Sequence, residues 1–212
     1  MDHFLEENAI QRNKIGFAWA NAGYGEVARF TGTPVERKLA FMKVNFEQHM
    51  VLSDYFAKLF IDRNKQLHCK SGLAMTASQS SFMPLKGCSM YFVAKASVSN
   101  LAAVLSAELA TYDIDVIAVH PTAIRDTRFH VRPEMCPNGT QILQGGVLID
   151  KTPIAVSPKK VVDTVFSRIG KICCCNCGAF ADFEALALPL GRNILSKLCQ
   201  RGPEYEAIVN AK

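Results

Sequence analysis

Tyr91 and Lys95 lie four residues apart in residues 91–109, a segment whose alanine- and leucine-rich composition predicts a helix. At this spacing two side chains share one face of a helix, about one turn apart. A free tyrosine loses its proton near pH ~10, and a neighbouring ammonium stabilises the phenolate, so such a pair can exchange protons near neutral pH. We therefore predict that Tyr91 acts as a general acid or base. The same spacing also arises by chance on many helices, where the lysine is a solvated head group.

The chain alternates short apolar runs with longer amphipathic segments, which is typical of parallel strands covered by helices. The sequence therefore predicts an α/β fold with a parallel sheet. The predicted strands are residues 15–20, 73–77, 114–119 and 172–180, and the predicted helices are residues 34–60, 91–109, 158–169 and 183–198. Ser157-Pro158 predicts the start of the third helix, with a capping serine before a proline in the first turn.

Polar side chains follow three of the predicted strands, at Asn21-Ala22-Gly23, Thr76-Ala77-Ser78 and Pro121-Thr122. In an open parallel sheet, ligands bind outside the carboxyl ends of the strands. We therefore expect the three clusters to border one crevice.

A single domain over residues 1–212 is expected, because a chain of 212 residues with 49% hydrophobic residues can bury one sizeable core. Residues 122–153 are polar and rich in turn residues, which indicates a substrate loop or lid. Residues 183–212 are expected to form a C-terminal helical tail.

The charge pattern argues against nucleic-acid binding. The net charge is only +5, from 24 Lys and Arg against 19 Asp and Glu, and no basic stripe with interleaved aromatic residues occurs. The first seven residues are too polar for a secretory signal, and no apolar run approaches the length of a membrane span. We expect a cytoplasmic protein without a transmembrane segment.

Four of the eight cysteines stand close together, at Cys173, Cys174, Cys175 and Cys177. A zinc or iron–sulfur site and reversible lipidation are two alternatives for this group. Zinc sites usually take separated pairs of ligands, whereas adjacent residues of a strand point to opposite faces. Small apolar side chains in a buried strand are the favoured interpretation, and no metal site is expected.

The tyrosine and lysine belong to a longer arrangement. The turn Asn21-Ala22-Gly23 follows the first predicted strand, Asn45 lies in the next helix, and Ser78 precedes Tyr91 by thirteen residues. In order and spacing this resembles the short-chain dehydrogenase/reductase family, whose members carry an Asn-Ala-Gly turn and an Asn, Ser, Tyr, Lys tetrad. The resemblance spans roughly residues 15–130.

The resemblance implies a role for each member of the tetrad. Tyr91 would protonate the carbonyl oxygen of a substrate, and Ser78 would hold that oxygen by a hydrogen bond. Lys95 would lower the pKa of Tyr91 and bind the nicotinamide ribose, and Asn45 would keep a helix open for a water that relays protons to Lys95. The cofactor, NADP or NAD, would contact a set of residues at the strand ends, namely Asn21, Ala22, Gly23, Tyr91, Lys95, Pro121, Thr122, Ile124 and Thr127.

The chain also departs from the family pattern. Family members begin with a strand and a glycine-rich turn that places a helix N-terminus against the cofactor pyrophosphate, and no such segment precedes residue 15. The expected fold is therefore a Rossmann-like doubly wound parallel sheet that lacks the first βαβαβ half. Thr122 stands where the family usually has glycine, and Thr127 comes one position after the usual threonine, which is replaced by Asp126.

Two functions follow as hypotheses. The first is an NAD(P)-dependent oxidoreductase that interconverts a ketone or aldehyde and an alcohol, a small molecule selected by residues 122–153 and of lipid-like or steroid-like character. The second is a catalytically incomplete remnant that acts as an interaction module. The remnant would pair through the helices at residues 34–60 and 91–109 with a full-length relative. The resemblance also implies a homo-oligomer through the same helices.

Overall fold

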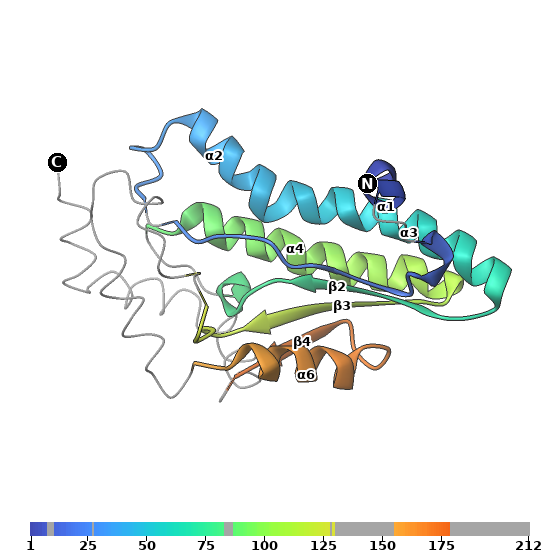
Figure 1. Ribbon diagram of the computed structural model, residues 1–212. Helices are drawn as coiled ribbons and strands as arrows, with labels where there is room; N and C mark the ends of the chain where they lie inside the picture. The colour runs from blue at the N-terminus through green and yellow to red at the C-terminus, as the bar shows by residue number, and fades with distance from the viewer. Residues whose placement is uncertain (8–10, 27, 83–86, 128, 130–154, 179–212) are drawn as a thin grey trace.

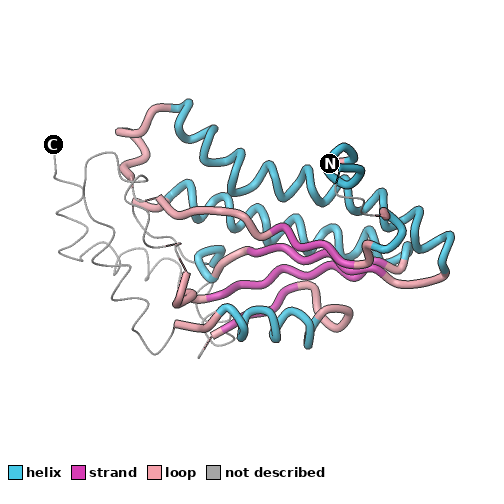
Figure 2. The backbone as a smooth tube through the Cα atoms, viewed as in Figure 1, coloured by secondary structure: helices cyan, strands magenta, loops and turns pink. Residues whose placement is uncertain are grey.

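The structure, a computed structural model, describes residues 1–212 except for residues 8–10, 27, 83–86, 128, 130–154 and 179–212. Within this described part, the chain forms a parallel four-stranded sheet in the order β1-β2-β3-β4. Figure 1 and Figure 2 show the strands running side by side between layers of helices. The strands are β1 (Phe17–Ala20), β2 (Ser71–Thr76), β3 (Ile114–Pro121) and β4 (Cys174–Cys177).

Helices cover both faces of this sheet (Figure 1). On one face, α3 (Gln48–Leu67) and α4 (Ser89–Leu109) pack against β1, β2 and β3, and on the other face α6 (Pro158–Arg168) packs against β3 and β4. This arrangement confirms the prediction of an α/β, Rossmann-like doubly wound parallel sheet. The remaining helical elements of the described residues are α1 (Asp2–Glu7), α2 (Val35–Met42), a π-helical turn (Lys43–Glu47) and the short 3-10 turns Arg12–Lys14, Gln79–Phe82 and Ala110–Tyr112.

The core has two parts, one on each face of the sheet. Leu73 and Met75 of β2 point into the cluster on the α3 and α4 side, whereas Ala74 points into the cluster on the α6 side. All three side chains are fully buried. Burial on both faces explains why the central strands appear in the sequence as continuous apolar runs instead of alternating patterns.

The predicted helix at residues 34–60 is one helical segment in the sequence but three elements in the structure. α2 is followed by a π-helical turn, Lys43–Glu47, before α3 begins. In that turn the Gln48 backbone N–H donates to the carbonyl of Lys43, five residues earlier. Apolar periodicity could not reveal this turn, because the helical path continues on both sides of it.

The start of α6 confirms the prediction from Ser157-Pro158. The Ser157 hydroxyl accepts a hydrogen bond of 3.2 Å from the Lys160 backbone N–H, and Pro158 occupies the first turn. The predicted tail at residues 183–212, and residues 130–153 of the predicted loop, lie outside the described residues.

The cysteines of β4 alternate between the two faces of the sheet. Cys174 packs beside the cluster on the α4 side, whereas Cys175 and Cys177 are buried in the cluster on the α6 side. In the described part of the chain, no three side chains of His, Cys, Asp or Glu are grouped so that they could hold a metal ion. The interpretation of these thiols as small buried side chains is consistent with this packing.

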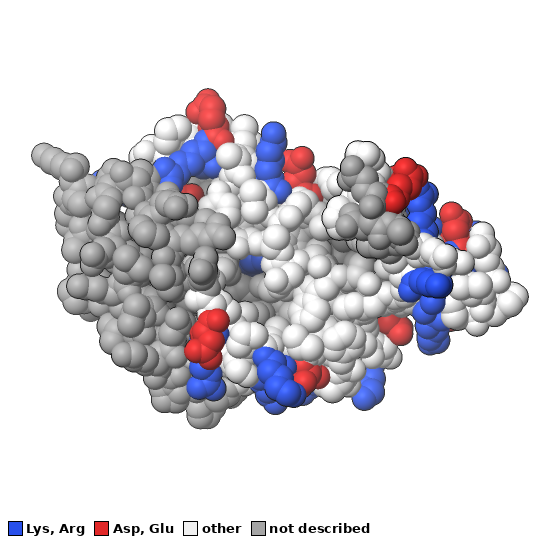
Figure 3. All heavy atoms as spheres, in the orientation of Figure 1, with Lys and Arg blue, Asp and Glu red and all other residues white. Residues whose placement is uncertain are grey.

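β1 is an edge of the sheet, and no described strand precedes it in the sequence. On the face of the molecule in Figure 3, Lys and Arg side chains are interspersed with Asp and Glu side chains. Among the described helices, Ser89–Tyr112 has the length and hydropathy of a membrane-spanning segment. This is weak evidence for a membrane, because the core helix of a globular protein has the same properties, and α4 packs against β2, β3 and α3.

His120 of β3 is a buried histidine with hydrogen bonds at both ring nitrogens. Its Nε2 lies 2.8 Å from the Ser99 hydroxyl, and its Nδ1 lies 3.3 Å from the carbonyl oxygen of Cys175. Burial lowers the pKa of His120 from 6.5 to about 4. The native state therefore holds this histidine neutral at a pH where the unfolded chain would protonate it.

We expect the free energy of unfolding to fall as the pH is lowered from 6.5 toward 4. Between these two pH values the unfolded chain binds a proton at this histidine that the folded protein does not bind. His120 therefore contributes up to about 1.4 kcal/mol per pH unit to the dependence of the free energy of unfolding on pH, and above pH 6.5 it contributes no further dependence. Urea unfolding at several pH values should show a shallower dependence for His120→Gln than for wild type. Exposed His3 provides the control variant, and an equal slope for His120→Gln and wild type would contradict the assignment.

Candidate active site

The carboxyl ends of β1 and β2 are joined by a chain of side-chain hydrogen bonds. Trp19 Nε1 of β1 donates to the Thr76 hydroxyl of β2 at 2.9 Å, and that hydroxyl donates to Asn21 Oδ1 at 2.7 Å. Asn21 is thus held against the end of β2 by its side chain. The strand ends are adjacent, as the polar clusters in the sequence predicted.

Lys95 is the least expected charge in the site, because its side chain is only 2% exposed. Its Nζ donates to the carbonyl oxygen of Thr76 at 2.8 Å, and it forms no ion pair with a carboxylate of the described residues. Burial lowers the pKa of Lys95 from 10.5 to about 8. Two N–H groups of the ammonium remain available beyond the bond to Thr76.

Tyr91 lies one helical turn before Lys95 on α4, and Lys95 Nζ is 6.0 Å from the centre of the tyrosine ring. Burial raises the pKa of Tyr91 above its ordinary value of 10.0, while hydrogen bonds with Ser78 and Ser80 act in the opposite direction. This differs from the expected lowering by Lys95, because the cost of burying a phenolate outweighs the effects of its neighbours. The tyrosine is therefore protonated in this structure and available as an acid.

Asn45 lies in the π-helical turn and is fully buried. Its Nδ2 donates to the Phe41 carbonyl at 3.2 Å, and its Oδ1 accepts from the Tyr24 backbone N–H at 2.9 Å. A Cβ atom at Gly23 would lie 2.9 Å from Asn45 Oδ1 and 3.2 Å from Lys95 Nζ. The backbone of the Asn-Ala-Gly turn thus approaches both side chains so closely that only glycine fits.

Ser78 follows β2, where its hydroxyl oxygen accepts from the Ser80 backbone N–H at 3.2 Å. The structure brings Ser78, Tyr91, Lys95 and Asn45 to one end of the sheet. The structure thus shows that these four side chains are neighbours, and their catalytic roles stay predictions.

The residues after β3 complete the neighbourhood. The Thr122 backbone N–H donates to the carbonyl of Cys177 at 3.1 Å, and Ile124 pairs with Val156. The Thr127 hydroxyl donates to the carbonyl of Ile124 at 3.1 Å, which turns the chain back toward the site. The ring of Phe129 then lies 6.0 Å from the ring of Tyr91.

Several residues of this region were not identified from the sequence. Ser80 lies near Tyr91 and acts to lower its pKa, as Ser78 does, and the Gln48 side chain donates to the Ala22 carbonyl at 2.6 Å. His49 is fully buried one turn after Asn45. For His49, the sequence offers one indication of its position: the four-residue spacing from Asn45 predicts that both side chains lie on the same face of a helix.

The residues present suit the nicotinamide end of a dinucleotide. Lys95 offers two unused N–H donors beside the Asn21–Gly23 turn, which matches the hydroxyl acceptors of a ribose. The residues do not suit the pyrophosphate of the cofactor in the same way. The glycine-containing turn at residues 21–25 is hydrogen-bonded to Asn45 and Gln48, and loop residues follow it where a phosphate site would have a helix N-terminus. The described residues therefore fit the nicotinamide ribose and lack a site for the pyrophosphate of the kind that a helix N-terminus provides.

Comparison with solved structures shows the same fold. The chain is similar to a 7beta-hydroxysteroid dehydrogenase, with a TM-score of 0.69 and 15% identity, over 88% of this chain and 67% of the other. A short chain dehydrogenase from Burkholderia cenocepacia in complex with NADP has a TM-score of 0.68 and 20% identity, with 94% of this chain and 75% of the other covered.

A bulky-bulky ketone specific alcohol dehydrogenase from Comamonas testosteroni has a TM-score of 0.63 and 21% identity, over 91% of this chain and 67% of the other. This chain thus covers between two thirds and three quarters of the length of these proteins. No curated protein matches the sequence. Residues 2–134 match the short chain dehydrogenase family, and this match covers well over half of the chain. The chain belongs to the short chain dehydrogenase family, a family of oxidoreductases.

Proposed function

We propose that this protein is an NAD(P)-dependent oxidoreductase that interconverts a ketone or aldehyde and the corresponding alcohol. The observation that carries the proposal is the buried ammonium of Lys95, which lies one turn from partly buried Tyr91 and has no carboxylate partner among the described residues. A buried charge without a counter-ion is costly, and groups of this kind cluster at functional sites.

Each residue has one chemical task in the proposed reaction. Tyr91 donates its proton to the carbonyl oxygen of the substrate, and Ser78 orients that oxygen through a hydrogen bond. Lys95 binds the ribose hydroxyls and returns a proton to the tyrosine oxygen. The nicotinamide supplies the hydride when the cofactor is bound. Reversing the proton transfers gives alcohol oxidation.

Two proteins of similar structure carry names that refer to steroids and bulky ketones. We propose a bulky, lipid-like carbonyl compound as the substrate class.

The proposal is tested by incubating the protein with NADPH or NADH and a panel of bulky cyclic and linear ketones. We expect cofactor oxidation that depends on the ketone, with one alcohol formed for each reduced cofactor consumed. Cofactor oxidation without alcohol formation would argue against carbonyl reduction.

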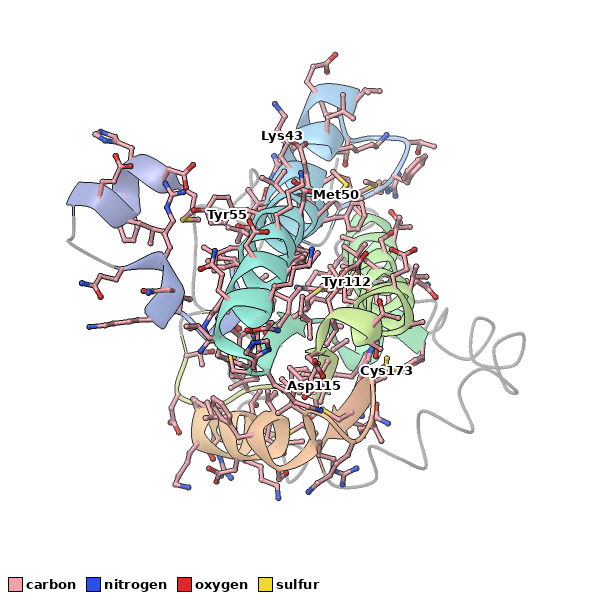
Figure 4. The ribbon with its side chains drawn as sticks, turned by 90° about the vertical axis from the view of Figure 1, so that its right-hand side faces the viewer. Lys43, Met50, Tyr55, Tyr112, Asp115 and Cys173 are labelled. Carbon is pink, nitrogen blue, oxygen red and sulfur yellow. The ribbon has the colours of Figure 1, made fainter. Side chains whose placement is uncertain are left out.

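The alternative hypothesis is that the chain is catalytically inactive and acts as an interaction module. It is favoured by the lack of a pyrophosphate site among the described residues and by exposed apolar side chains on α3, on α4 and in the turn after α4. These are Met50, Val51, Val93, Val104 and Tyr112, each at least 42% exposed. Figure 4 shows Met50 and Tyr112 where α3 and α4 run side by side. The enzyme would bury this face in a homo-oligomer, and the remnant would bury it against a full-length relative.

We expect sedimentation analysis to give a dimer for the wild-type protein and a monomer for Val104→Glu. The substitution places a charge on the outer face of α4, where a partner helix would have to desolvate it. Val162→Glu on the exposed side of α6 is the matched control, because Val162 is 41% exposed and lies away from α3 and α4. A dimer that survives Val104→Glu but dissociates with Val162→Glu would place the interface on the opposite face.

A further inference from the structure

β1 presents a free backbone edge on the side that faces away from β2. The Gly72 N–H of β2 donates to the Gly16 carbonyl at 2.9 Å. In a parallel ladder, alternate residues of a strand bond the same neighbour, so the residue after Gly16 faces the opposite way. The N–H and C=O groups of Phe17 and Trp19 therefore point outward, and no hydrogen bond from another described segment reaches them.

β1 also lacks the features that protect the edges of sheets in native proteins. Such edges often carry charged residues or proline, which discourage pairing with another strand. Residues 15–20, Ile-Gly-Phe-Ala-Trp-Ala, contain no charged residue and no proline. Figure 1 shows β1, in blue, in front of the other strands, and in Figure 3 the described surface along it consists of uncharged side chains. This edge is a template for a further strand.

An apolar surface lies beside this edge, on the α6 side of the sheet. The centres of the rings of Phe17 and Phe166 are 5.0 Å apart, and those of Phe17 and Trp19 are 6.3 Å apart. Phe166 is 57% exposed, and Val162, one turn before it on α6, is 41% exposed. We call the side chains of Phe17, Trp19, Val162 and Phe166 the apolar shelf.

The aromatic rings of β1 leave its backbone accessible. A Cβ atom at Gly72 would lie 2.8 Å from Phe17 Cδ2, so the ring of Phe17 lies over β2. The indole of Trp19 also reaches β2, where its Nε1 donates to the Thr76 hydroxyl at 2.9 Å. Both rings thus extend inward over the sheet, away from the outer side of β1. An incoming strand can therefore bond the backbone and place its own side chains against the apolar shelf.

The N-terminal helix favours a single extended segment over a second copy of this chain. α1 lies against α3 on the β1 side of the molecule, where the Tyr55 hydroxyl donates to the Asp2 carboxylate (Figures 1 and 4). A second copy that paired with β1 would have to place its helices in the space that α1 occupies. A single segment needs only the outer side of β1 and the apolar shelf.

We propose that the outer edge of β1 and the apolar shelf bind an extended, apolar segment of another polypeptide, which joins the sheet as an additional strand. In this mode of recognition, backbone hydrogen bonds supply affinity and the contacts of alternate side chains supply specificity. Alternate residues of the bound segment face the α6 side, where the apolar shelf requires uncharged, apolar side chains. This surface differs from the exposed face of α3 and α4, and binding to it does not depend on catalysis.

Binding is tested with the whole chain and a synthetic peptide in which valine and threonine alternate between terminal lysines. Trp19 is the only tryptophan of the chain, so its fluorescence reports directly on this edge. We expect a saturable blue shift of its emission at submillimolar peptide. A control peptide with the same side chains but methylated backbone nitrogens cannot donate the strand hydrogen bonds, and should give no shift. No shift with the first peptide, or equal shifts with both, would overturn the proposal.

Phe166→Ser tests the apolar shelf, because it removes an exposed ring that the bound segment would cover. We expect the dissociation constant of the valine–threonine peptide to rise at least about tenfold. Val93→Ser, at a site on α4 that is 53% exposed, is the matched control and should keep the wild-type affinity. Both sites are more than half exposed, so both variants should fold, which thermal unfolding checks. Equal affinities of Phe166→Ser and wild type would show that the shelf takes no part.

Hydrogen exchange measured by NMR identifies the backbone groups that the peptide bonds. In the free protein we expect fast exchange at the amides of Phe17 and Trp19, and slow exchange at Ala18 and Ala20, which face β2. The peptide should slow exchange at Phe17 and Trp19. Slow exchange of these two amides in the free protein would overturn the proposal. If that protection grew with protein concentration, the edge would belong to a second copy, and otherwise to another part of the same chain.

Discussion

Tyr91→Phe should lower ketone-dependent oxidation of NAD(P)H by ~10²–10⁴, because the substitution removes only the hydroxyl that acts as the general acid. The ring would keep its packing against Phe92 and Phe129, so the fold should be preserved. Steady-state rates at saturating ketone would measure the loss, and thermal unfolding would confirm that the variant is folded.

Tyr112→Phe is the matched control for this experiment. Tyr112 lies in the turn after α4 and is 42% exposed, with its ring near Lys65, away from the candidate site. We expect this variant to keep the wild-type rate. A folded Tyr91→Phe protein with full activity would contradict the assignment of the acid.

The second large effect concerns the pyrophosphate of the cofactor. We expect that adding a strand, a glycine-rich turn and a helix ahead of residue 15 tightens NAD(P)H binding by at least about a hundredfold. Backbone N–H groups and the positive end of a helix dipole hold a pyrophosphate in this family. Each charge-assisted hydrogen bond is worth ~1.5–3 kcal/mol, and 1.4 kcal/mol is a factor of ten in affinity, so two retained bonds are sufficient.

The comparison requires dissociation constants and turnover rates for the 212-residue chain and for the extended version. In the control, the added segment keeps its length but has bulky residues in place of its glycines, which closes the approach of the backbone to the phosphates. We expect the 212-residue chain to turn over poorly beside the extended version. Equal, robust rates in both would show that the described residues hold the cofactor by other means.

Much of the fold was predictable from the sequence because the central strands β2 and β3 are buried on both faces of the sheet and are therefore continuous apolar runs. The apolar runs at residues 73–77 and 114–119 correspond to β2 and β3, with boundaries shifted by one or two residues. The short run at residues 172–180 contains β4, and of its described residues only Cys174–Cys177 form a strand. The family resemblance also identified Tyr91 and Lys95, since their spacing on one helix sets their relative positions.

The electrostatic state of the site could not be predicted in the same way. The sequence places Lys95 near Tyr91 but does not reveal that Lys95 is buried and Tyr91 partly buried, and desolvation determines the direction of both pKa shifts. The π-helical turn that buries Asn45 likewise arises from tertiary contacts, including the bond from the Tyr24 backbone. His49 escaped notice because a single histidine on an apolar helix face has no sequence signature.

Cofactor binding is the most direct test of the central claim, that Lys95 and Tyr91 form a nicotinamide site. The measurement is a calorimetric titration of the 212-residue chain with NADPH and with NADH, repeated with Lys95→Met and with the exposed-lysine control Lys58→Met. We expect saturable binding of at least one cofactor below millimolar concentration, retained in Lys58→Met and lost in Lys95→Met. No saturable binding of either cofactor at millimolar concentration would contradict the enzyme and favour the interaction module.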